Sequence, residues 1–283
     1  MFSPAQYELL DFGDGRKLER FGDHVLDRPS PAAENFAPAH PERWPTADAR
    51  YERSEGSDGV WRPAGALPES WTIAHGPLTL ELKPTPFGHL GVFAEQAANW
   101  DWIAEQIGRT SRPVKLLNLF AYTGGATLAA AAAGAEVTHV DAAHNTVAWA
   151  RRNAELSSLE AAPIRWIVED AATFAAREVR RGNQYDGVIL DPPTYGHGPN
   201  GQTWTLKDDL RSLLVDCAKL TSAAPLLLVF SCHTLGWEGQ ELLAALSAAG
   251  FNDPPAHAKA VQMQPTPPRG RTLPSGAVAR CAW

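Results

Sequence analysis

The sequence predicts an α/β fold in which a doubly wound sheet, mostly parallel with an antiparallel last strand, follows a small β-rich extension. Short apolar stretches alternate with stretches of helical periodicity from about residue 76 to residue 250. A turn with two glycines joins one apolar stretch to the next helix, and acidic residues follow several of the expected strands. Strands buried on both faces and separated by helices are typical of parallel sheets covered on both sides.

Residues 1–75 are expected to form a small β-rich extension that is also rich in Trp and Pro. Alternating stretches separated by turn residues such as Gly13–Gly15 predict a β-meander over residues 1–30. From Pro29 to Trp71, isolated tryptophans in a Pro-rich context predict an irregular segment with buried indoles. Residues 76–283 are expected to form the catalytic domain.

The periodicity of residues 76–283 predicts alternating strands and helices. The strands are expected at Leu78–Leu82, Val114–Phe120, Glu136–Val140, Ile164–Val168, Gly187–Leu190 and Pro225–Phe230, with a final antiparallel pair at Ala258–Gln264 and Gly276–Trp283. The helices are expected at Phe93–Ile107, Ala126–Ala133, Thr146–Leu156, Ala172–Arg181, Lys207–Leu220 and Glu238–Ala249.

The composition limits the class of protein. Hydrophobic residues make up 44% of the 283 residues and charged residues 20%, which is typical of globular proteins. No apolar stretch reaches the ~18–20 residues that cross a bilayer, and no signal peptide is recognisable, so we expect a cytoplasmic location without membrane contact. Three scattered cysteines predict neither a disulfide framework nor a metal site. The net charge of −7 does not favour general binding of nucleic acid, although a local basic face is compatible with it.

The segment Asn118–Thr127 leads from a buried strand through Gly124 and Gly125 into a helix. Such a turn lets the backbone approach a ligand closely and directs a helix N-terminus at an anionic group. It lacks the G-x-G-x-x-G pattern of nicotinamide cofactor sites. The next strands end at Asp141, where a carboxylate can accept both hydroxyls of an adenosine ribose, and near Asp170, where one can accept from the adenine amine. Either acid alone could be a helix N-cap, but together with the turn they predict an adenosine-containing cofactor.

The strand Gly187–Leu190 is followed by Asp191, Pro192, Pro193 and, after Thr194, Tyr195. Two prolines remove backbone donors, so the carbonyl groups and the Asp191 carboxylate remain as acceptors. A planar base that carries an amino group suits such a surface. The Gly- and Asn-rich stretch after Pro193 could act as a substrate lid, and an aromatic residue in it could stack on a flipped base.

Several of these segments resemble the class I S-adenosylmethionine-dependent methyltransferases of the 23S rRNA methyltransferase I/K/L group, which includes the ribosomal 5-methylcytosine enzymes. The resembling segments are Leu116–Thr127, Asp141, Asp170, Asp191–Tyr195, Phe230–Cys232 and, upstream, Gly88–Gln96. The resemblance implies a Rossmann-like methyltransferase sheet, S-adenosylmethionine as cofactor, and ribosomal RNA as partner. It departs from the group in the acidic net charge, in residues 1–75, which do not resemble a PUA domain, and in Thr194-Tyr195, which is closer to a guanine-methylating branch than to the cytosine enzymes.

The resemblance and the strand-end pattern together assign expected roles to individual residues. Cofactor binding is expected of Phe93, Gln96, Asn118, Phe120, Tyr122, Thr123, Gly124, Gly125, Asp141, Ala142, Asp170, Ala171 and Asp191. Catalysis is expected of Cys232 and Asp191, and substrate binding of Pro192, Pro193 and Tyr195.

Cys232 separates two forms of the implied reaction, methyl transfer to a nucleobase. In 5-methylcytosine formation a thiolate adds to carbon 6 of the ring, and carbon 5 then attacks the methyl group. A cysteine that ends a buried strand is also explained as a small apolar core residue. Methylation of a guanine nitrogen or of a small molecule, without a covalent step, is therefore an alternative. From other classes, a nucleotide-cofactor oxidoreductase and a non-catalytic S-adenosylmethionine-binding protein are alternatives, and the sequence does not indicate the oligomeric state.

Overall fold

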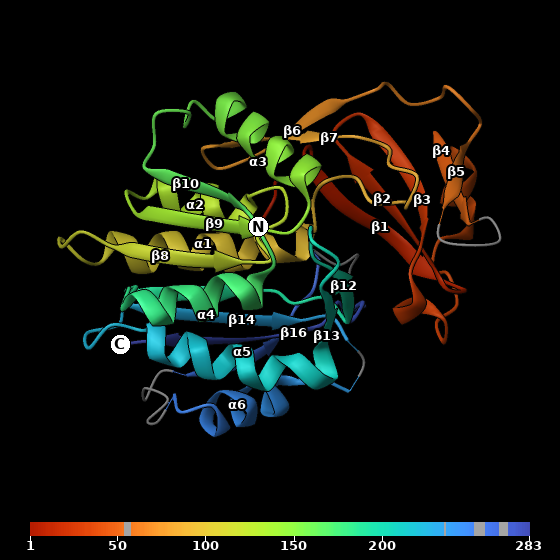
Figure 1. The fold of residues 1–283 in the computed structure, drawn as a ribbon. Coiled ribbons are helices and arrows are strands. Elements are labelled where there is room, and N and C mark those ends of the chain that lie inside the picture. Colours follow the sequence, from red (N-terminus) through yellow and green to blue (C-terminus); the bar gives the residue numbers. More distant parts are fainter. Residues whose placement is uncertain (54–57, 235, 252–257, 266–270) are drawn as a thin grey trace. The chain divides into compact units, whose positions relative to one another are not determined.

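The computed structural model describes residues 1–53, 58–234, 236–251, 258–265 and 271–283 (Figure 1). The chain forms two compact units, which are described separately below. Unit 1 comprises Met1–Ala97 and Gln264–Ser275, and unit 2 comprises Ala98–Met263 and Gly276–Trp283. The expected start of a catalytic domain near residue 76 stays a prediction. The local sequence pattern did not indicate that the late segment Gln264–Ser275 belongs to unit 1.

Unit 1 is built on a sheet of strands in the order β1-β2-β3-β4-β5. The strands are β1 (Tyr7–Gly13), β2 (Arg16–Phe21), β3 (His24–Pro29), β4 (Ala49–Arg53) and β5 (Gly59–Arg62), and a separate hairpin pairs β6 (Trp71–His75) with β7 (Leu78–Leu82). Short 3-10 helices lie at η1 (Pro31–Ala33), η2 (Pro41–Thr46) and η3 (Ala94–Gln96). The β-meander of residues 1–30 is confirmed. The irregular segment expected after it was wrong in part, because β4 and β5 lie within it.

The indoles of that segment are half-buried and not fully buried as expected. Each is nevertheless held in place, because its ring N–H donates a hydrogen bond that lies between 2.9 and 3.1 Å. The acceptors are the Asp11 carboxylate for Trp44, the Thr85 carbonyl for Trp61 and the Phe21 carbonyl for Trp71.

Unit 2 is an α/β domain whose described strands form one sheet in the order β10-β9-β8-β11-β14-β16-β15. The strands are β8 (Lys115–Leu119), β9 (Glu136–Asp141), β10 (Ile164–Val168), β11 (Gly187–Leu190), β14 (Leu227–Cys232), β15 (Lys259–Gln262) and β16 (Ala277–Ala282). The first five are parallel, whereas β16 runs antiparallel to β14 and to β15. The predicted fold class, with its antiparallel last strand, is confirmed.

Helices cover both faces of this sheet (Figure 1). The helices are α1 (Ala97–Gly108), α2 (Gly125–Ala132), α3 (His144–Leu156), α4 (Ala171–Arg181), α5 (Leu206–Leu220) and α6 (Gly239–Ala248). On one face of the sheet, apolar residues of α4, α5 and α6 pack with alternate strand residues in one core. On the other face, apolar residues of α1 and α2 pack with strand residues that point the opposite way, in a second core. Because five strands of the sheet are parallel, their carboxyl ends lie along one edge, and ligands bind at this edge in such sheets.

Three further findings concern the described part of the chain. The stretch after Pro193, which could act as a substrate lid, contains a two-stranded hairpin of β12 (Tyr195–His197) and β13 (Thr203–Thr205), and its role as a lid stays a prediction. Among the described residues no helix is long and apolar enough to span a membrane. Within the same residues no group of three or more potential ligand side chains forms a metal site.

Candidate functional site

The turn between β8 and α2 has a backbone that few residues can adopt. Phe120, Tyr122 and Gly124 have positive φ angles of 55, 50 and 90°. A Cβ atom on Gly125 would lie 2.3 Å from the Trp100 ring, so only glycine fits there. The turn thus brings the first amides of α2 to the carboxyl edge of the sheet, where free N–H groups favour an anionic group such as a carboxylate.

Asp141 is the last residue of β9 and lies beside this turn. Its Oδ2 accepts a hydrogen bond from the Tyr122 amide at 2.9 Å, and its Oδ1 accepts one from the Ala143 amide at 3.0 Å. Burial raises the pKa of Asp141, and these two hydrogen bonds oppose that effect. Each carboxylate oxygen has a further lone pair that can accept a hydroxyl. Ala142 follows directly, so the structure brings Tyr122, Asp141 and Ala142 together as predicted.

Asp170 has a structural role that the sequence offered as an alternative. It is the N-cap of α4, and its Oδ1 accepts from the backbone amide and the hydroxyl of Thr173 at 2.8 and 2.7 Å. Ala171 begins the helix. The hydrogen bond of Asp170 to an adenine amine stays a prediction, and the cap places its carboxylate one strand away from Asp141.

A buried polar chain lies beneath the glycine turn. The Asn118 amide donates to the Thr127 hydroxyl at 2.9 Å, and this hydroxyl lies 2.9 Å from Nδ1 of His139. Burial first, and then the charge of Arg151, lowers the pKa of His139 to about 3. Only Asn118 of this chain was predicted as a site residue. The signal for the others was present, because Thr127 and His139 are polar residues in otherwise apolar elements.

Asp191 directly follows β11 and lies at the other side of the same edge. Its Oδ2 lies 3.5 Å from Nε2 of His233. The hydroxyls of Thr194 and Thr234 lie 2.6 Å apart, which ties the Asp-Pro-Pro-Thr turn to the segment after β14. The structure thereby places next to one another two segments that are about 40 residues apart in the chain.

The aromatic residues of the β12–β13 hairpin differ in exposure. Trp204 is 3% exposed, its indole N–H donates to the Pro193 carbonyl at 2.8 Å, and its ring centroid lies 4.9 Å from that of Phe120. It is therefore a core residue and not a surface for a flipped base. Tyr195 is 56% exposed, so its ring is accessible.

Cys232 ends β14 with its side chain in the apolar core that faces α4, α5 and α6. It is 0% exposed. Burial raises the pKa of the Cys232 thiol and the charge of Asp191 adds to this, whereas hydrogen bonds from Thr234 oppose it. The Cys232 thiol is thus buried, and its surroundings disfavour its ionisation. A nucleophilic cysteine is in general more accessible and has a lowered pKa.

Two predicted cofactor residues belong to unit 1. Phe93 is the N-cap residue of η3, and its ring centroid lies 5.5 Å from that of His89. Gln96 is the last residue of η3. Their roles in cofactor binding stay predictions.

Comparisons with known proteins agree with this arrangement. A family model described as S-adenosylmethionine-dependent methyltransferase matches residues 34–242. A crystal structure of a SAM-dependent methyltransferase from Agrobacterium tumefaciens has 37% identity and a TM-score of 0.91, covering 98% of this chain and 90% of that one. A curated relative, ribosomal RNA large subunit methyltransferase K/L of Hahella chejuensis, is 32% identical over 145 residues, which is 50% of this chain and 19% of that protein.

A second curated relative is ribosomal RNA large subunit methyltransferase I of Aeromonas salmonicida. It is 27% identical over 198 residues, which is 65% of this chain and 48% of that protein. The chain therefore spans about a fifth of the length of the first relative and about half of the second.

Proposed function

Because the chain belongs to the S-adenosylmethionine-dependent methyltransferases, we propose that it methylates an amino nitrogen of a nucleobase in ribosomal RNA, without a covalent enzyme intermediate. Family membership makes the chain an enzyme and S-adenosylmethionine its cofactor, and an oxidoreductase does not fit this family. The names of the curated relatives support RNA as the substrate. Asp191 and the two prolines after it support a base with an amino group.

The residues of unit 2 fit the cofactor. The first amides of α2, from Gly125 onward, suit the cofactor's carboxylate, whereas the Gly124 amide donates to the Ala121 carbonyl at 3.1 Å within the turn. Asp141 is held by two backbone amides and retains lone pairs for the ribose hydroxyls. Asp170, one strand further, is assigned to the adenine amine. When bound, S-adenosylmethionine supplies a methyl group on a sulfonium, which makes that carbon electrophilic.

Asp191 orients the acceptor in this proposal. Its carboxylate accepts a hydrogen bond from the amino group of the base, which directs the nitrogen lone pair at the methyl carbon. As the nitrogen–carbon bond forms and the sulfonium–carbon bond breaks, the amino nitrogen must lose one proton. Asp191 takes this proton, and His233, 3.5 Å away, can receive it and release it to solvent. The exposed ring of Tyr195 is available to stack on the base.

The burial of Cys232 is the observation that favours direct transfer over the cytosine reaction. A covalent step would need an accessible thiolate, whereas this thiol is enclosed in the core and its pKa is raised. Transfer to an amino nitrogen needs no covalent adduct with the ring, because the nitrogen lone pair attacks the methyl carbon when the hydrogen bond to Asp191 reduces its conjugation with the ring.

The proposal is tested with S-adenosylmethionine that carries a tritiated methyl group. The substrate is ribosomal RNA from a strain that lacks the gene, and total protein and small-molecule extracts serve as competing acceptors. We expect label in RNA, and we expect no denaturation-resistant adduct with RNA that contains 5-fluorocytidine. Label in the other fractions and none in RNA would contradict the RNA substrate. A trapped adduct that is lost in Cys232→Ser would contradict direct transfer.

A further inference from the structure

A cavity in unit 1 gathers cationic and aromatic side chains that the mechanism above does not use. Its volume is about 140 Å³. Its lining includes Lys17, Arg28, Arg53, Phe87, His89 and Glu95. A water molecule occupies ~30 Å³ of liquid, and drug-sized ligands need pockets of roughly 300 Å³ or more, so this cavity suits a group the size of a phosphate.

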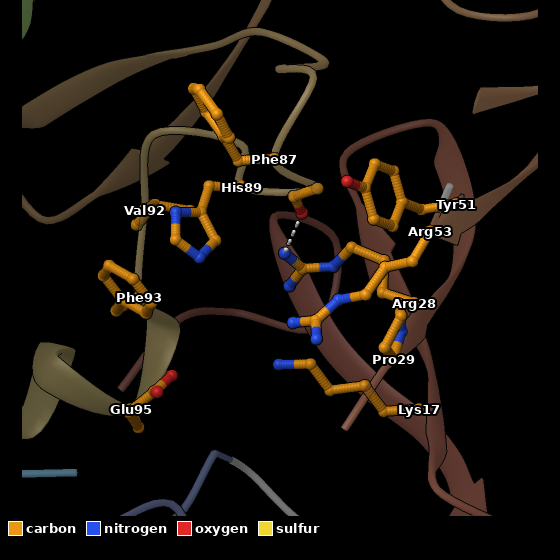
Figure 2. A pocket seen from close by; sticks show the side chains of 11 residues that line it. Lys17, Arg28, Pro29, Tyr51, Arg53, Phe87, His89, Val92, Phe93 and Glu95 are labelled. Atoms are coloured by element: carbon orange, nitrogen blue, oxygen red, sulfur yellow. Dashed lines mark hydrogen bonds between the residues drawn. The ribbon is translucent and has the colours of Figure 1, made fainter. Parts of the chain in front are cut away.

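The charges around this cavity do not cancel. Glu19 is buried, does not line the cavity, and accepts hydrogen bonds from Nε and a terminal nitrogen of Arg28 at 2.9 and 2.6 Å. The ammonium group of Lys17 lies 3.1 Å from the same carboxylate. Arg53 forms no ion pair with any residue that the structure describes, and Figure 2 shows its guanidinium directed into the same space as the guanidinium of Arg28 and the ammonium group of Lys17. Among the described residues, the three cations that line the cavity outnumber the carboxylates of Glu19 and Glu95 by one positive charge.

His89 lines the cavity across from these three cations (Figure 2). Burial lowers the pKa of His89 most strongly, and the charges of Arg28, Lys17 and Arg53 lower it further. An anion in the cavity would offset these charges.

The loop that carries Phe87 is fixed on the sheet, so the cavity is formed in advance. The Tyr51 hydroxyl donates to the Pro86 carbonyl at 2.6 Å, and Arg28 donates to the Gly88 carbonyl at 3.2 Å. Gly88 packs so closely that a Cβ atom there would lie 2.8 Å from the Tyr51 ring. Phe87 nevertheless remains 57% exposed. A large aromatic ring held outward beside a cationic cavity suits a nucleobase next to a phosphate.

We propose that this cavity binds a phosphate group of the RNA strand and that an adjacent unstacked base packs on Phe87, an inference that rests on the RNA substrate of the proposed function. Guanidinium groups donate two parallel hydrogen bonds to phosphate oxygens. A protein with a net charge of −7 must hold RNA through such local cationic sites.

The test measures binding of a fluorescent single-stranded RNA decamer to the full chain at several salt concentrations. Arg53→Gln is expected to raise the Kd about three- to fivefold and to reduce the slope of log K against log salt by about 0.7. Phe87→Ala is expected to raise the Kd about tenfold. Arg62→Gln is the matched control, because Arg62 is exposed on β5, pairs with Glu52 and does not line the cavity. Equal effects of Arg53→Gln and Arg62→Gln would overturn the proposal.

A second readout separates the possible sources of phosphate. Binding of the decamer is expected to raise the pKa of His89, followed by NMR of its ring protons, in wild type and less in Arg53→Gln. If inorganic phosphate or a nucleoside monophosphate causes this rise and the decamer does not, the cavity binds a free nucleotide and the RNA assignment is wrong. Failure of the proposed function looks different, because the wild type would then bind the decamer normally but label no RNA with methyl groups.

Discussion

Two regions at the same edge of the unit 2 sheet are held in place in different ways. The proposed cofactor end comprises the turn Phe120–Gly125 with Asp141, and the proposed acceptor end comprises Asp191–Tyr195 with the segment Cys232–Thr234. At the cofactor end, backbone amides fix the carboxylate of Asp141. At the acceptor end, exposed side-chain hydroxyls join the two segments, and Asp191 lies near a half-exposed histidine.

The different ways in which the two ends are held match the two proposed tasks, binding of the cofactor and binding of the acceptor base. The cofactor is one molecule of constant shape, so a site made of backbone groups can be fixed in advance. An acceptor base arrives on a large RNA and must be enclosed, which suits a more open region held by side chains. If this view is correct, substitutions at the two ends have separable effects on cofactor affinity and on turnover.

The largest effect is expected from Asp191→Asn at the acceptor end. The variant keeps the shape of the side chain but loses the charge that orients the amino group and takes its proton. We expect kcat for RNA methylation to fall about 100-fold or more, with the Kd for S-adenosylmethionine unchanged within about twofold. Single-turnover methyl transfer and isothermal titration measure the two quantities. A comparable loss of cofactor affinity would show that the two ends are not separable.

Asp141→Asn at the cofactor end is expected to have the converse effect. An amide can accept only at one of the two positions where the carboxylate accepts, so hydrogen bonds to a charged group are lost. We expect the Kd for S-adenosylmethionine to rise about 10- to 100-fold, while kcat at saturating cofactor stays within about threefold. Unchanged cofactor affinity would remove Asp141 from the cofactor site.

His139 is buried under the cofactor end and connects stability to pH. In the unfolded chain the pKa of His139 is the ordinary histidine value of 6.5, whereas burial in the folded chain lowers it to about 3. Below pH 6.5 the unfolded state takes up a proton that the folded state does not, so stability falls as the pH falls, by up to about 1.4 kcal/mol per pH unit.

His139→Gln should remove this dependence, because glutamine does not titrate and can still accept from Thr127. We expect urea unfolding to show that the free energy of unfolding of the wild type falls by about 2 kcal/mol more than that of the variant between pH 6.5 and about pH 5. The same loss in both proteins would mean that His139 is not a buried neutral residue.

The smallest effect is expected from Cys232→Ala under the acceptor end. A core thiol contributes packing and no chemistry, so we expect kcat to stay within about threefold of wild type and stability to fall by about 1 kcal/mol. RNA methylation and urea unfolding measure these two values, and Cys217→Ala is a matched control for loss of a buried thiol. An activity loss confined to Cys232→Ala would restore the cysteine as a nucleophile.

Much of unit 2 could be predicted from the sequence because its central strands β8, β11 and β14 are buried on both faces and helices such as α4 and α5 are amphipathic. Ile164–Val168 and Gly187–Leu190 were predicted with the bounds that the structure has. The position of Asp141 beside the turn Phe120–Gly125 could also be predicted, because parallel strands end at a common edge. Here local patterns and topology point to the same answer.

Other features depend on contacts that no local pattern contains. The strands β4 and β5 are only five and four residues long, so their alternation of more and less buried positions is too short to stand out in a Pro-rich context. The cationic cavity combines residues from β2, β3, β4 and the loop after β7, which are distant in the chain. Cys232 is buried because α4, α5 and α6 cover the face of the sheet to which it points. The sequence of the strand does not show which helices cover that face.

The most direct test of the central claim is to identify the methylated nucleoside. RNA labelled by the wild-type chain is digested to nucleosides, and the methyl-bearing species is identified by mass spectrometry against standards. We predict a nucleoside methylated on an amino nitrogen, absent after reaction with Asp191→Asn. Recovery of 5-methylcytidine would contradict direct transfer to nitrogen and would require a catalytic thiol that the folded protein exposes only during the reaction.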